Sequence, residues 1–158
     1  MGQIVLVTGG VRSGKSAFAE RYATHCAETH GAKVAYIATA QVYDEEMRQR
    51  VDLHQARRPA DWVTYEAPFE TENAVRAAGA EYGVILFDCI TMFLSNDMLQ
   101  YPEEEQERDS FALHVEERIH ALIQAAEDVD ATTIFVTNEV GSGIVPEHRL
   151  GRLYRDMA

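Results

Sequence analysis

Positive charge is scarce in this chain of 158 residues, and that scarcity excludes a class of protein. Lysine and arginine number 14 against 26 aspartates and glutamates, so the formal charge at pH 7 is −12. A protein that binds nucleic acid along a broad surface carries a basic face, so the charge argues against that class. An anionic ligand would have to be held by a local basic pocket.

Cysteine and long apolar runs are also scarce. Cys26 and Cys89 lie far apart and form no CxxC motif, so neither a zinc site nor a disulfide framework is predicted. We expect two buried free thiols in a reducing compartment. No apolar run approaches the roughly 18 residues of a membrane span, and the short run Ile4–Val7 does not resemble a signal peptide. The expected location is the cytoplasm, without insertion into a membrane.

Short runs of β-branched and apolar residues predict four buried strands: Ile4–Thr8, Lys33–Ala38, Val84–Asp88 and Thr133–Thr137. Each run is almost continuously apolar, as in parallel strands that are covered on both faces. No repeat and no linker rich in glycine, serine or proline interrupts the chain. Residues 1–158 are therefore interpreted as a single domain.

Helical patterns fill the intervals between these runs. Residues Lys15–Thr29 carry apolar side chains at helical spacing and stop before Gly31, which favours a helix that ends at a glycine. Pro102, followed by three glutamates, predicts the start of another helix, whose apolar stripe runs from Phe111 to Ala126. Alternating strands and helices predict a three-layer α/β domain.

The segment Gly9–Ser16, GGVRSGKS, matches the phosphate-binding pattern G-x-x-x-x-G-K-[ST]. Glycines let backbone N–H groups surround a phosphate without Cβ clashes. Lys15, one of only two lysines, can reach the β- and γ-phosphates, and the Ser16 hydroxyl can join a Mg²⁺ shell. Because an apolar run precedes the motif and a helix follows it, we predict a nucleotide site rather than an ordinary turn. Its contacts are Gly9, Gly10, Val11, Arg12, Ser13, Gly14, Lys15 and Ser16.

The strand predicted at Val84–Asp88 ends in a carboxylate, which is the pattern of the second motif of phosphate-binding sites. Asp88 would bind Mg²⁺ directly or through water. Many strands end in aspartate because the residue suits turns, so this interpretation depends on the accompanying Gly9–Ser16 loop.

A segment rich in arginine runs from Asp44 to Arg58. Asp44 can cap a helix that extends to about Arg57, since Pro59 discourages its continuation.

His54 lies on this predicted helix and shares a face with Arg50 and Arg58. Guanidinium neighbours disfavour an imidazolium, so we expect a neutral, nucleophilic ring near pH 7. The same arginines could neutralise a triphosphate presented to the ring, which suits attack by nitrogen on phosphorus. The spacing by itself favours the simpler alternative, a helix histidine beside surface arginines.

Longer motifs along the chain indicate a resemblance to one protein family, which the phosphate loop alone would be too common to indicate. Together they resemble the family of bifunctional adenosylcobinamide kinases/adenosylcobinamide-phosphate guanylyltransferases, and they are spread over nearly the whole chain. Besides GGVRSGKS they are IATAQ (Ile37–Gln41), DEEMRQRVDLHQARRPADW (Asp44–Trp62), FDCITMFLSN (Phe87–Asn96), NEVGSGIVP (Asn138–Pro146) and RLYRD (Arg152–Asp156).

The resemblance implies a RecA-like P-loop domain with a mainly parallel central sheet and two linked reactions in cobalamin synthesis. ATP or GTP phosphorylates the aminopropanol hydroxyl of adenosylcobinamide. GTP, with Mg²⁺, then places GMP on an enzyme histidine, and the GMP passes to adenosylcobinamide phosphate to give adenosylcobinamide-GDP. Members of the family form symmetric homo-oligomers, typically trimers.

The resemblance also assigns site residues. By its position in the R-x-x-x-H-x-x-x-R-P-x-x-W block, His54 matches the guanylylated histidine, and Lys15 acts in catalysis. Further nucleotide contacts map onto Ala38, Thr39, Ala40, Gln55, Ala56, Arg57, Arg58, Glu66 and Asp88. Polar residues that could orient the corrinoid hydroxyl or a phosphate are Asn138, Glu139 and Arg155, although each could equally belong to a turn or a surface helix.

Two other functions stay open at this point. A plain P-loop small-molecule kinase would use the loop and leave His54 structural. A GTP-dependent switch is the third possibility, although the guanine-reading pattern N/T-K-x-D is absent and Thr137–Val140 is its nearest match. Where this chain ends at Ala158, the family continues through another helix and strand, so either the sequence is truncated or the fold ends differently. Loss of that strand would expose a sheet edge or apolar surface.

Overall fold

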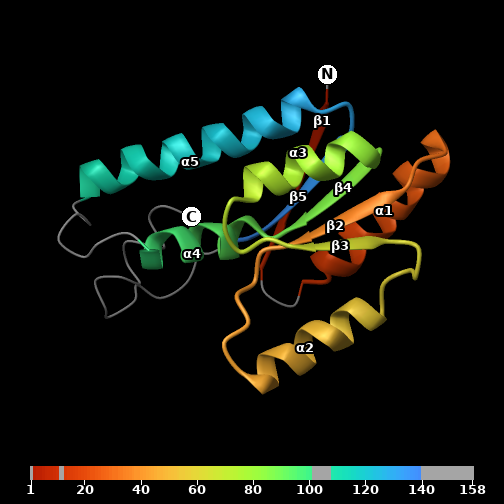
Figure 1. Cartoon of the computed structure of the whole chain (residues 1–158), viewed down its shortest axis with the longest axis horizontal. Coiled ribbons are helices and arrows are strands. Elements are labelled where there is room, and N and C mark those ends of the chain that lie inside the picture. The colour runs from red at the N-terminus through yellow and green to blue at the C-terminus, as the bar shows by residue number, and fades with distance from the viewer. Residues whose placement is uncertain (1, 11–12, 101–107, 140–158) are drawn as a thin grey trace.

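The computed structural model describes residues 2–10, 13–100 and 108–139 (Figure 1). The strands in these ranges are β1 (Gln3–Gly9), β2 (Val34–Ala38), β3 (Val63–Glu66), β4 (Val84–Asp88) and β5 (Thr132–Asn138). The helices are α1 (Lys15–His30), α2 (Glu45–Ala56), α3 (Thr71–Glu81), α4 (Ile90–Gln100) and α5 (Arg108–Asp128). None of the described helices is long and apolar enough to cross a membrane.

The described strands form one sheet in the order β1-β5-β4-β2-β3, and every neighbouring pair is parallel. β5 lies between β1, which precedes the phosphate loop, and β4, which ends in Asp88, and the parallel central sheet confirms the prediction. The register aligns Gly9 with Asn138, and it aligns Ala38 with both Asp88 and Glu66. The carboxyl ends of the strands therefore meet at one edge of the sheet.

Helices cover both faces of the sheet, which confirms the predicted three layers (Figure 1). On one face α1 buries Ala23 in a cluster that includes Ile134 of β5. On the other face α3, α4 and α5 surround a larger cluster, in which Leu122 and the aromatic residues Phe87 and Phe135 are buried. The rings of Phe87 and Phe135 lie 5.1 Å apart, within the range of favourable aromatic pairs.

Successive residues of β2 point to opposite layers, as the two-residue period of a strand requires. Ile37 belongs to the cluster beneath α3 and α5, whereas Tyr36 belongs to the cluster beneath α1. Both side chains are buried, and Tyr36 is 7% exposed.

α2 lies outside the layers, beyond the carboxyl edge of the sheet (Figure 1). None of its residues is buried. Asp44 caps the helix, since its Oδ1 atom accepts a hydrogen bond of 2.8 Å from the backbone N–H of Met47. The C-cap is Arg57, so the helix predicted from Asp44 to about Arg57 is confirmed.

The four predicted strand runs are all strands, and α1 ends at Gly31 as predicted. Gly31 has φ 61°, a left-handed conformation that suits glycine, and its N–H donates to the carbonyl of Ala27. Cys26 and Cys89 are free and buried, as expected. The sequence reading missed three elements, namely β3, α3 and α4.

The expectation that all four runs are covered on both faces is wrong for β1. This strand is at the edge of the described sheet, and Ile4 and Leu6 are 41% and 60% exposed. Val5 and Val7 point instead to the cluster beneath α1. An almost continuous apolar run thus belongs to an edge strand here.

The helix start predicted at Pro102 lies outside the described residues. So do most of the NEVGSGIVP motif and all of the RLYRD motif, including Arg155. The apolar stripe from Phe111 to Ala126 belongs to α5, where both of these residues are fully buried.

Candidate active site

Predicted site residues come from four different strand ends, and the parallel sheet collects them. Gly9 ends β1, Ala38 ends β2, Glu66 ends β3 and Asp88 ends β4. In open α/β sheets, ligands bind outside the carboxyl ends of the strands, and this is the edge where these residues lie.

The phosphate loop connects β1 to α1. Gly14 has φ 84°, and its carbonyl accepts a hydrogen bond of 3.0 Å from Phe18 N–H as α1 begins. A Cβ at Gly9 would lie 2.8 Å from Ser13 Oγ, so a side chain there would displace the Ser13 hydroxyl within the loop. Lys15 Nζ donates to the carbonyl of Gly10 at 3.2 Å. Val11 and Arg12 lie outside the described residues.

No described side chain caps the N-terminus of α1, so its first N–H groups face the loop without a side-chain acceptor. A helix start of this kind can bind an anion. Gly9, Ser13, Gly14 and Lys15 line a cavity of about 800 Å³ that continues between β1 and α1.

A second cavity, of about 160 Å³, lies between α2 and the ends of β2 and β4. It is smaller than the roughly 300–1,000 Å³ of ordinary ligand pockets, so it suits one group of a ligand, such as a phosphate. It brings together His54 and Arg58, from the α2 segment, with Asp88 of β4. The lining residues are Tyr36, Ala38, Ala40, Val51, His54, Arg58, Asp88, Cys89 and Met92.

Arg58 is buried in this cavity, with 9% of its surface exposed. Its Cζ lies 3.6 Å from the centre of the Tyr36 ring, a close cation–π contact. The Tyr36 hydroxyl donates a hydrogen bond to Asp88 Oδ2. Burial, followed by the charge of Asp88 and this hydrogen bond, raises the pKa of Tyr36 far above its usual range, so the phenol keeps its proton.

Thr39, a predicted nucleotide contact, is fully buried, and its side chain connects the ends of two strands. Its hydroxyl donates to the carbonyl of Cys89 at 2.9 Å and accepts from the N–H of Cys89 at 2.9 Å. Asn96 of α4 donates to the carbonyl of Thr39 at 2.6 Å. These bonds fix the end of β2 against the residue that follows Asp88.

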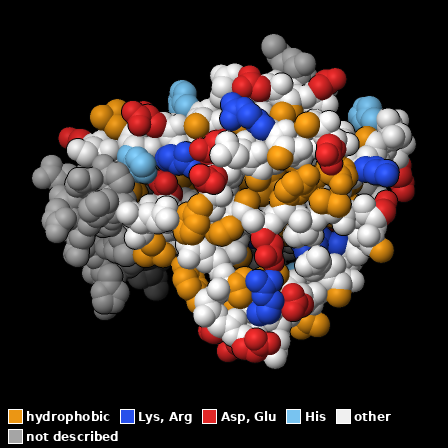
Figure 2. Space-filling model, viewed as in Figure 1, with side chains coloured by type: hydrophobic (Ala, Val, Ile, Leu, Met, Phe, Trp, Pro, Cys, Tyr) orange, Lys and Arg blue, Asp and Glu red, His pale blue; other side chains and the backbone are white. Residues whose placement is uncertain are grey.

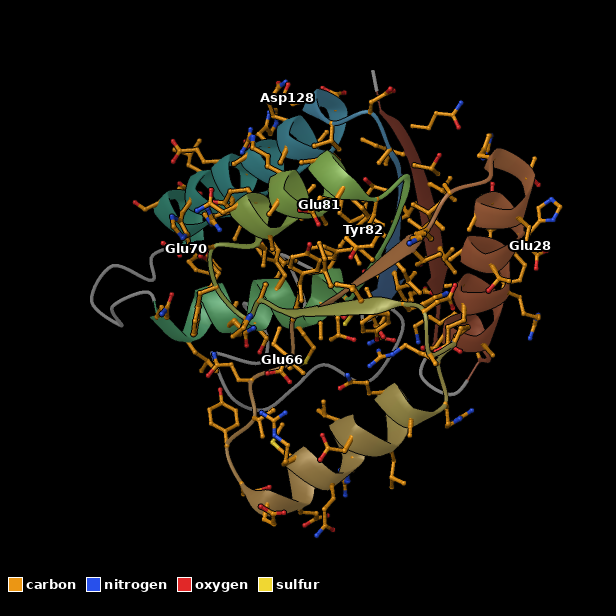
Figure 3. The ribbon with its side chains drawn as sticks, turned by 45° about the vertical axis from the view of Figure 1, so that its right-hand side comes forward. Glu28, Glu66, Glu70, Glu81, Tyr82 and Asp128 are labelled. Atoms are coloured by element: carbon orange, nitrogen blue, oxygen red, sulfur yellow. The ribbon has the colours of Figure 1, made fainter. Side chains whose placement is uncertain are left out.

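Of the other predicted nucleotide contacts, Glu66, Gln55, Ala56 and Arg57 do not line this cavity. Glu66 Oε1 accepts a hydrogen bond of 2.8 Å from Arg48 and so connects β3 to α2 (Figure 3). Gln55, Ala56 and Arg57 are exposed at the end of α2. Basic and acidic side chains mix over this part of the surface, in the lower part of the view (Figure 2).

No described residue lines both cavities. Burial raises the pKa of the Cys89 thiol, while the Lys15 ammonium lowers it. Lys15 of the phosphate loop thus acts electrostatically on a residue beside His54 and Asp88.

Asn138 and Glu139, which the sequence offered as residues that could orient the corrinoid hydroxyl or a phosphate, both form hydrogen bonds within the protein. Asn138 Nδ2 donates to Thr91 Oγ1 at 3.2 Å, and the N–H of Glu139 donates to the carbonyl of Gly9 at 2.9 Å. Asn138 ends β5 and Glu139 follows it, at the same edge as the phosphate loop, and Glu139 is exposed.

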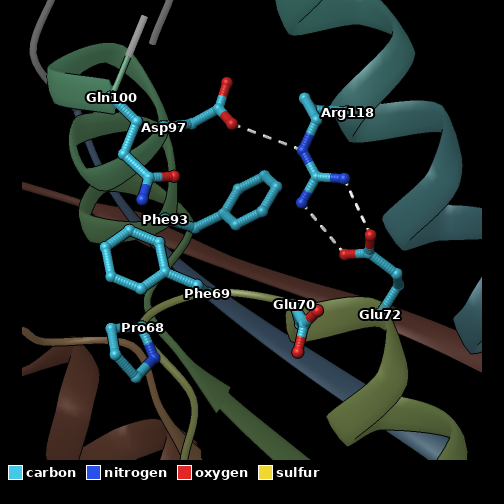
Figure 4. Close-up of a pocket in the computed structure, with 8 residues that line it drawn as sticks. All are labelled: Pro68, Phe69, Glu70, Glu72, Phe93, Asp97, Gln100 and Arg118. Atoms are coloured by element: carbon cyan, nitrogen blue, oxygen red, sulfur yellow. Dashed lines mark hydrogen bonds and ion pairs between the residues drawn. The ribbon is translucent and has the colours of Figure 1, made fainter.

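A further cavity, of about 220 Å³, lies among α3, α4 and α5 and contains none of the predicted residues (Figure 4). Arg118 crosses it and pairs with Glu72 through two hydrogen bonds of 2.7 and 3.0 Å, and with Asp97 at 3.4 Å. His114 Nε2 lies 2.6 Å from Asp97 Oδ2. These partners are far apart in the chain, so no local sequence signal could have revealed the group.

Comparison with known proteins supports the sequence resemblance. Residues 5–158 match the family described as cobinamide kinase / cobinamide phosphate guanyltransferase. The chain belongs to this family.

Among curated members of the cobinamide kinase / guanyltransferase family, the bifunctional adenosylcobalamin biosynthesis protein CobP of Pseudomonas aeruginosa is 41% identical. That alignment covers 97% of this chain and 81% of the relative. The protein CobU of Salmonella typhimurium, with the same description, is 39% identical over 98% of this chain and 85% of the relative.

The structure of this chain can be aligned with the solved structure of a KaiC-like protein of Pyrococcus horikoshii. The alignment covers 99% of this chain and 68% of the KaiC-like chain. Its TM-score is 0.45 and its sequence identity is 20%.

Proposed function

We propose that this protein phosphorylates adenosylcobinamide and then transfers GMP to the product through His54. The observation that carries the proposal is one cavity in which His54 and Arg58 meet Asp88, next to a phosphate loop, in a chain of the cobinamide kinase / guanyltransferase family. Membership of this family supports the bifunctional enzyme over a plain kinase or a GTP-dependent switch.

The kinase step depends on positioning and charge neutralisation rather than on covalent chemistry. The substrate hydroxyl oxygen attacks the γ-phosphorus of ATP or GTP, the nucleoside diphosphate leaves, and the hydroxyl proton passes to solvent. Lys15 would neutralise the phosphate charge, and the N–H groups at the start of α1 would bind the phosphate oxygens.

The transfer step divides one displacement into two. An imidazole nitrogen of His54 attacks the α-phosphorus of GTP, and the bond to the bridging oxygen breaks as pyrophosphate leaves. A phosphate oxygen of adenosylcobinamide phosphate then attacks the same phosphorus. The P–N bond breaks, its electron pair returns to the ring, and adenosylcobinamide-GDP is released. Arg58 would bind the phosphate charge beside His54.

The side chains at this edge fit a magnesium ion. Mg²⁺ prefers one or two carboxylates or hydroxyls together with phosphate oxygens, rather than a cage made only of protein ligands. Asp88 and Ser16 are such groups, and the described residues hold no cluster of three or more histidine, cysteine or acidic side chains for a metal. The ion would screen phosphate charge when bound.

Mass spectrometry of the intact protein after incubation with GTP and Mg²⁺ tests the proposal. We expect an added GMP on His54 of the wild type and none in His54→Ala. His54 is exposed, so the substitution should leave the fold intact. Phosphorylation of adenosylcobinamide should persist in the variant and serves as its control. A wild type that stays unmodified yet keeps kinase activity would identify a plain P-loop kinase instead.

We also propose that the chain is a single domain, that it forms a homotrimer and that it is located in the cytoplasm. Support for the oligomer is the exposed apolar side chains at α2, where Tyr43 and Leu53 are 65% and 67% exposed. Light scattering of the purified protein measures its mass in solution. A monomer at micromolar concentration would contradict the trimer.

A further inference from the structure

Tyr36 contacts two of the predicted nucleotide-site residues at once. Its hydroxyl donates to Asp88 Oδ2, and its ring lies beneath the Arg58 guanidinium at 3.6 Å. Neither the sequence patterns nor the resemblance drew attention to this residue, which is central to β2 and 7% exposed.

Arg58 depends on this ring for its position. Its Nε atom is buried and has no hydrogen-bond partner, and no described side chain forms an ion pair with its guanidinium. A buried cation that forms no ion pair is unfavourable, because its lost hydration is not replaced. The cation–π contact replaces part of that interaction, and an anionic ligand in the cavity beside His54 would supply the rest.

Asp88 depends on the hydroxyl. One carboxylate oxygen accepts from Tyr36, while the carboxylate lies at the cavity wall. A hydrogen bond to one oxygen of a metal-binding carboxylate fixes its orientation, and loss of such a partner commonly weakens metal binding or activity by roughly 10- to 100-fold.

We propose that Tyr36 is the positioning residue of this site: its hydroxyl orients Asp88 toward the metal ion, and its ring holds Arg58 toward the phosphate beside His54. This inference rests on the proposed function. Because the two roles belong to different parts of one side chain, they can be separated. Tyr36→Phe keeps the ring and removes the hydroxyl, whereas Tyr36→Leu removes both.

The first measurement is calorimetric binding of α,β-methylene GTP, whose α–β bond cannot be cleaved, across a series of Mg²⁺ concentrations. We expect Tyr36→Phe to raise the Mg²⁺ concentration for half-maximal binding about tenfold, with wild-type affinity for the nucleotide at saturating Mg²⁺. Tyr36→Leu should also weaken the nucleotide affinity at saturating Mg²⁺, because Arg58 loses its support.

Tyr65→Phe is the matched control. Tyr65 lies on β3 and packs against the core beneath α3 and α5, and it is not part of the cavity. Removing its hydroxyl should leave both the Mg²⁺ dependence and the nucleotide affinity unchanged. If Tyr36→Phe and Tyr65→Phe behave alike, or if Tyr36→Phe already weakens affinity at saturating Mg²⁺, the inference is overturned.

Arg58→Lys provides the second variant if Tyr36→Leu fails to fold. A lysine lacks the planar guanidinium that stacks on a ring, so this variant should lower nucleotide affinity and leave the Mg²⁺ dependence unchanged. A change in Mg²⁺ dependence instead would contradict the division of roles.

The binding assay also separates this inference from the proposed function. Wild-type protein that binds the analogue with Mg²⁺ but gains no GMP would defeat the transferase proposal, and the Tyr36 variants would still be decisive. GMP on His54 of the wild type, with unchanged Mg²⁺ dependence in Tyr36→Phe, would defeat only the inference.

Discussion

The phosphate-loop helix α1 and the histidine helix α2 serve the same edge of the sheet but are held in different ways. α1 buries Ala19, Ala23, Cys26 and Ala27 against strands. α2 buries no residue and is connected to the sheet by Arg48, which pairs with Glu66, and by Arg58 just beyond its end, which stacks on Tyr36.

This difference suits two kinds of chemistry. A phosphate loop needs donors at fixed positions, and a helix anchored by packing provides them. A histidine that accepts GMP and then delivers it must meet two partners in turn. Attachment by a few polar contacts, with little buried surface, is typical of segments that open at low cost in free energy.

The largest effect is expected in the phosphate loop, at the start of the packed helix α1. Lys15→Ala should lower kinase turnover by about 10²- to 10³-fold, the range found when one donor to developing charge is removed. The Lys15 ammonium makes an exposed hydrogen bond to the Gly10 carbonyl, so its loss should leave the thermal midpoint unchanged. Steady-state kinetics with ATP and adenosylcobinamide measure the loss. Lys33→Ala, at an exposed position, is the control, and an equal loss there would refute the assignment.

The next comparison concerns stability. Ala23→Leu on α1 should cost about 1–3 kcal/mol, because the position is fully buried and has no room for extra methylenes. Leu53→Ala on α2, where the side chain is 67% exposed, should change the free energy of unfolding by less than about 0.5 kcal/mol. Urea unfolding measures both. Equal costs would show that α2 is packed as firmly as α1.

A smaller effect is expected at the connection between α2 and β3. Arg48→Ala should raise the GTP concentration for half-maximal GMP labelling of His54 about two- to fivefold, as for an exposed ion pair. Arg76→Ala is a matched control, since Arg76 forms a similarly exposed ion pair of 3.1 Å with Asp128, away from α2. Labelling followed by mass spectrometry compares them. If the two variants have equal effects, Glu66 does not position the helix.

The smallest effect is expected at the opposite face of the sheet, where α3 and α5 are joined by charge. The Arg118 hydrogen bond holds the pKa of Glu72 below its usual 4.5. The unfolded state therefore binds more protons in acid, and the stabilisation present above pH 4.5 is lost as the pH falls through the lowered pKa.

Urea midpoints from about pH 6 to about pH 3 measure this loss. In Glu72→Gln the urea midpoint should fall less steeply with decreasing pH than in the wild type. In Glu116→Gln, at an exposed position of α5, the pH dependence of the midpoint should be unchanged. A wild-type curve identical to that of Glu72→Gln would contradict the assignment.

Strands, loops and caps whose signals lie in neighbouring residues could be predicted from the sequence alone. The GGVRSGKS motif, the cap at Asp44 and the buried run ending at Asp88 each follow from neighbouring residues. β3 escaped detection because it has only four residues, two of them exposed and two partly buried. α4 escaped detection because its apolar residues follow β4 almost without a break.

The partnership of Tyr36, Arg58 and Asp88 could not be predicted from spacing. Tyr36 and Asp88 are separated by 52 positions, and only strand pairing makes them neighbours. The exposure of β1 was missed for a similar reason, since the position of a strand in the sheet is a property of the topology and not of its own residues.

The register of β2 within the sheet determines what fraction of the molecules in a purified sample can be active. Ala38 is opposite Asp88 on one side and Glu66 on the other, so this strand sets the spacing of the whole edge. A shift of β2 by a single position would turn Tyr36 to the wrong layer and separate it from both Arg58 and Asp88. Misaligned molecules would stay compact yet inert, and specific activity would report the fraction of correctly paired sheets.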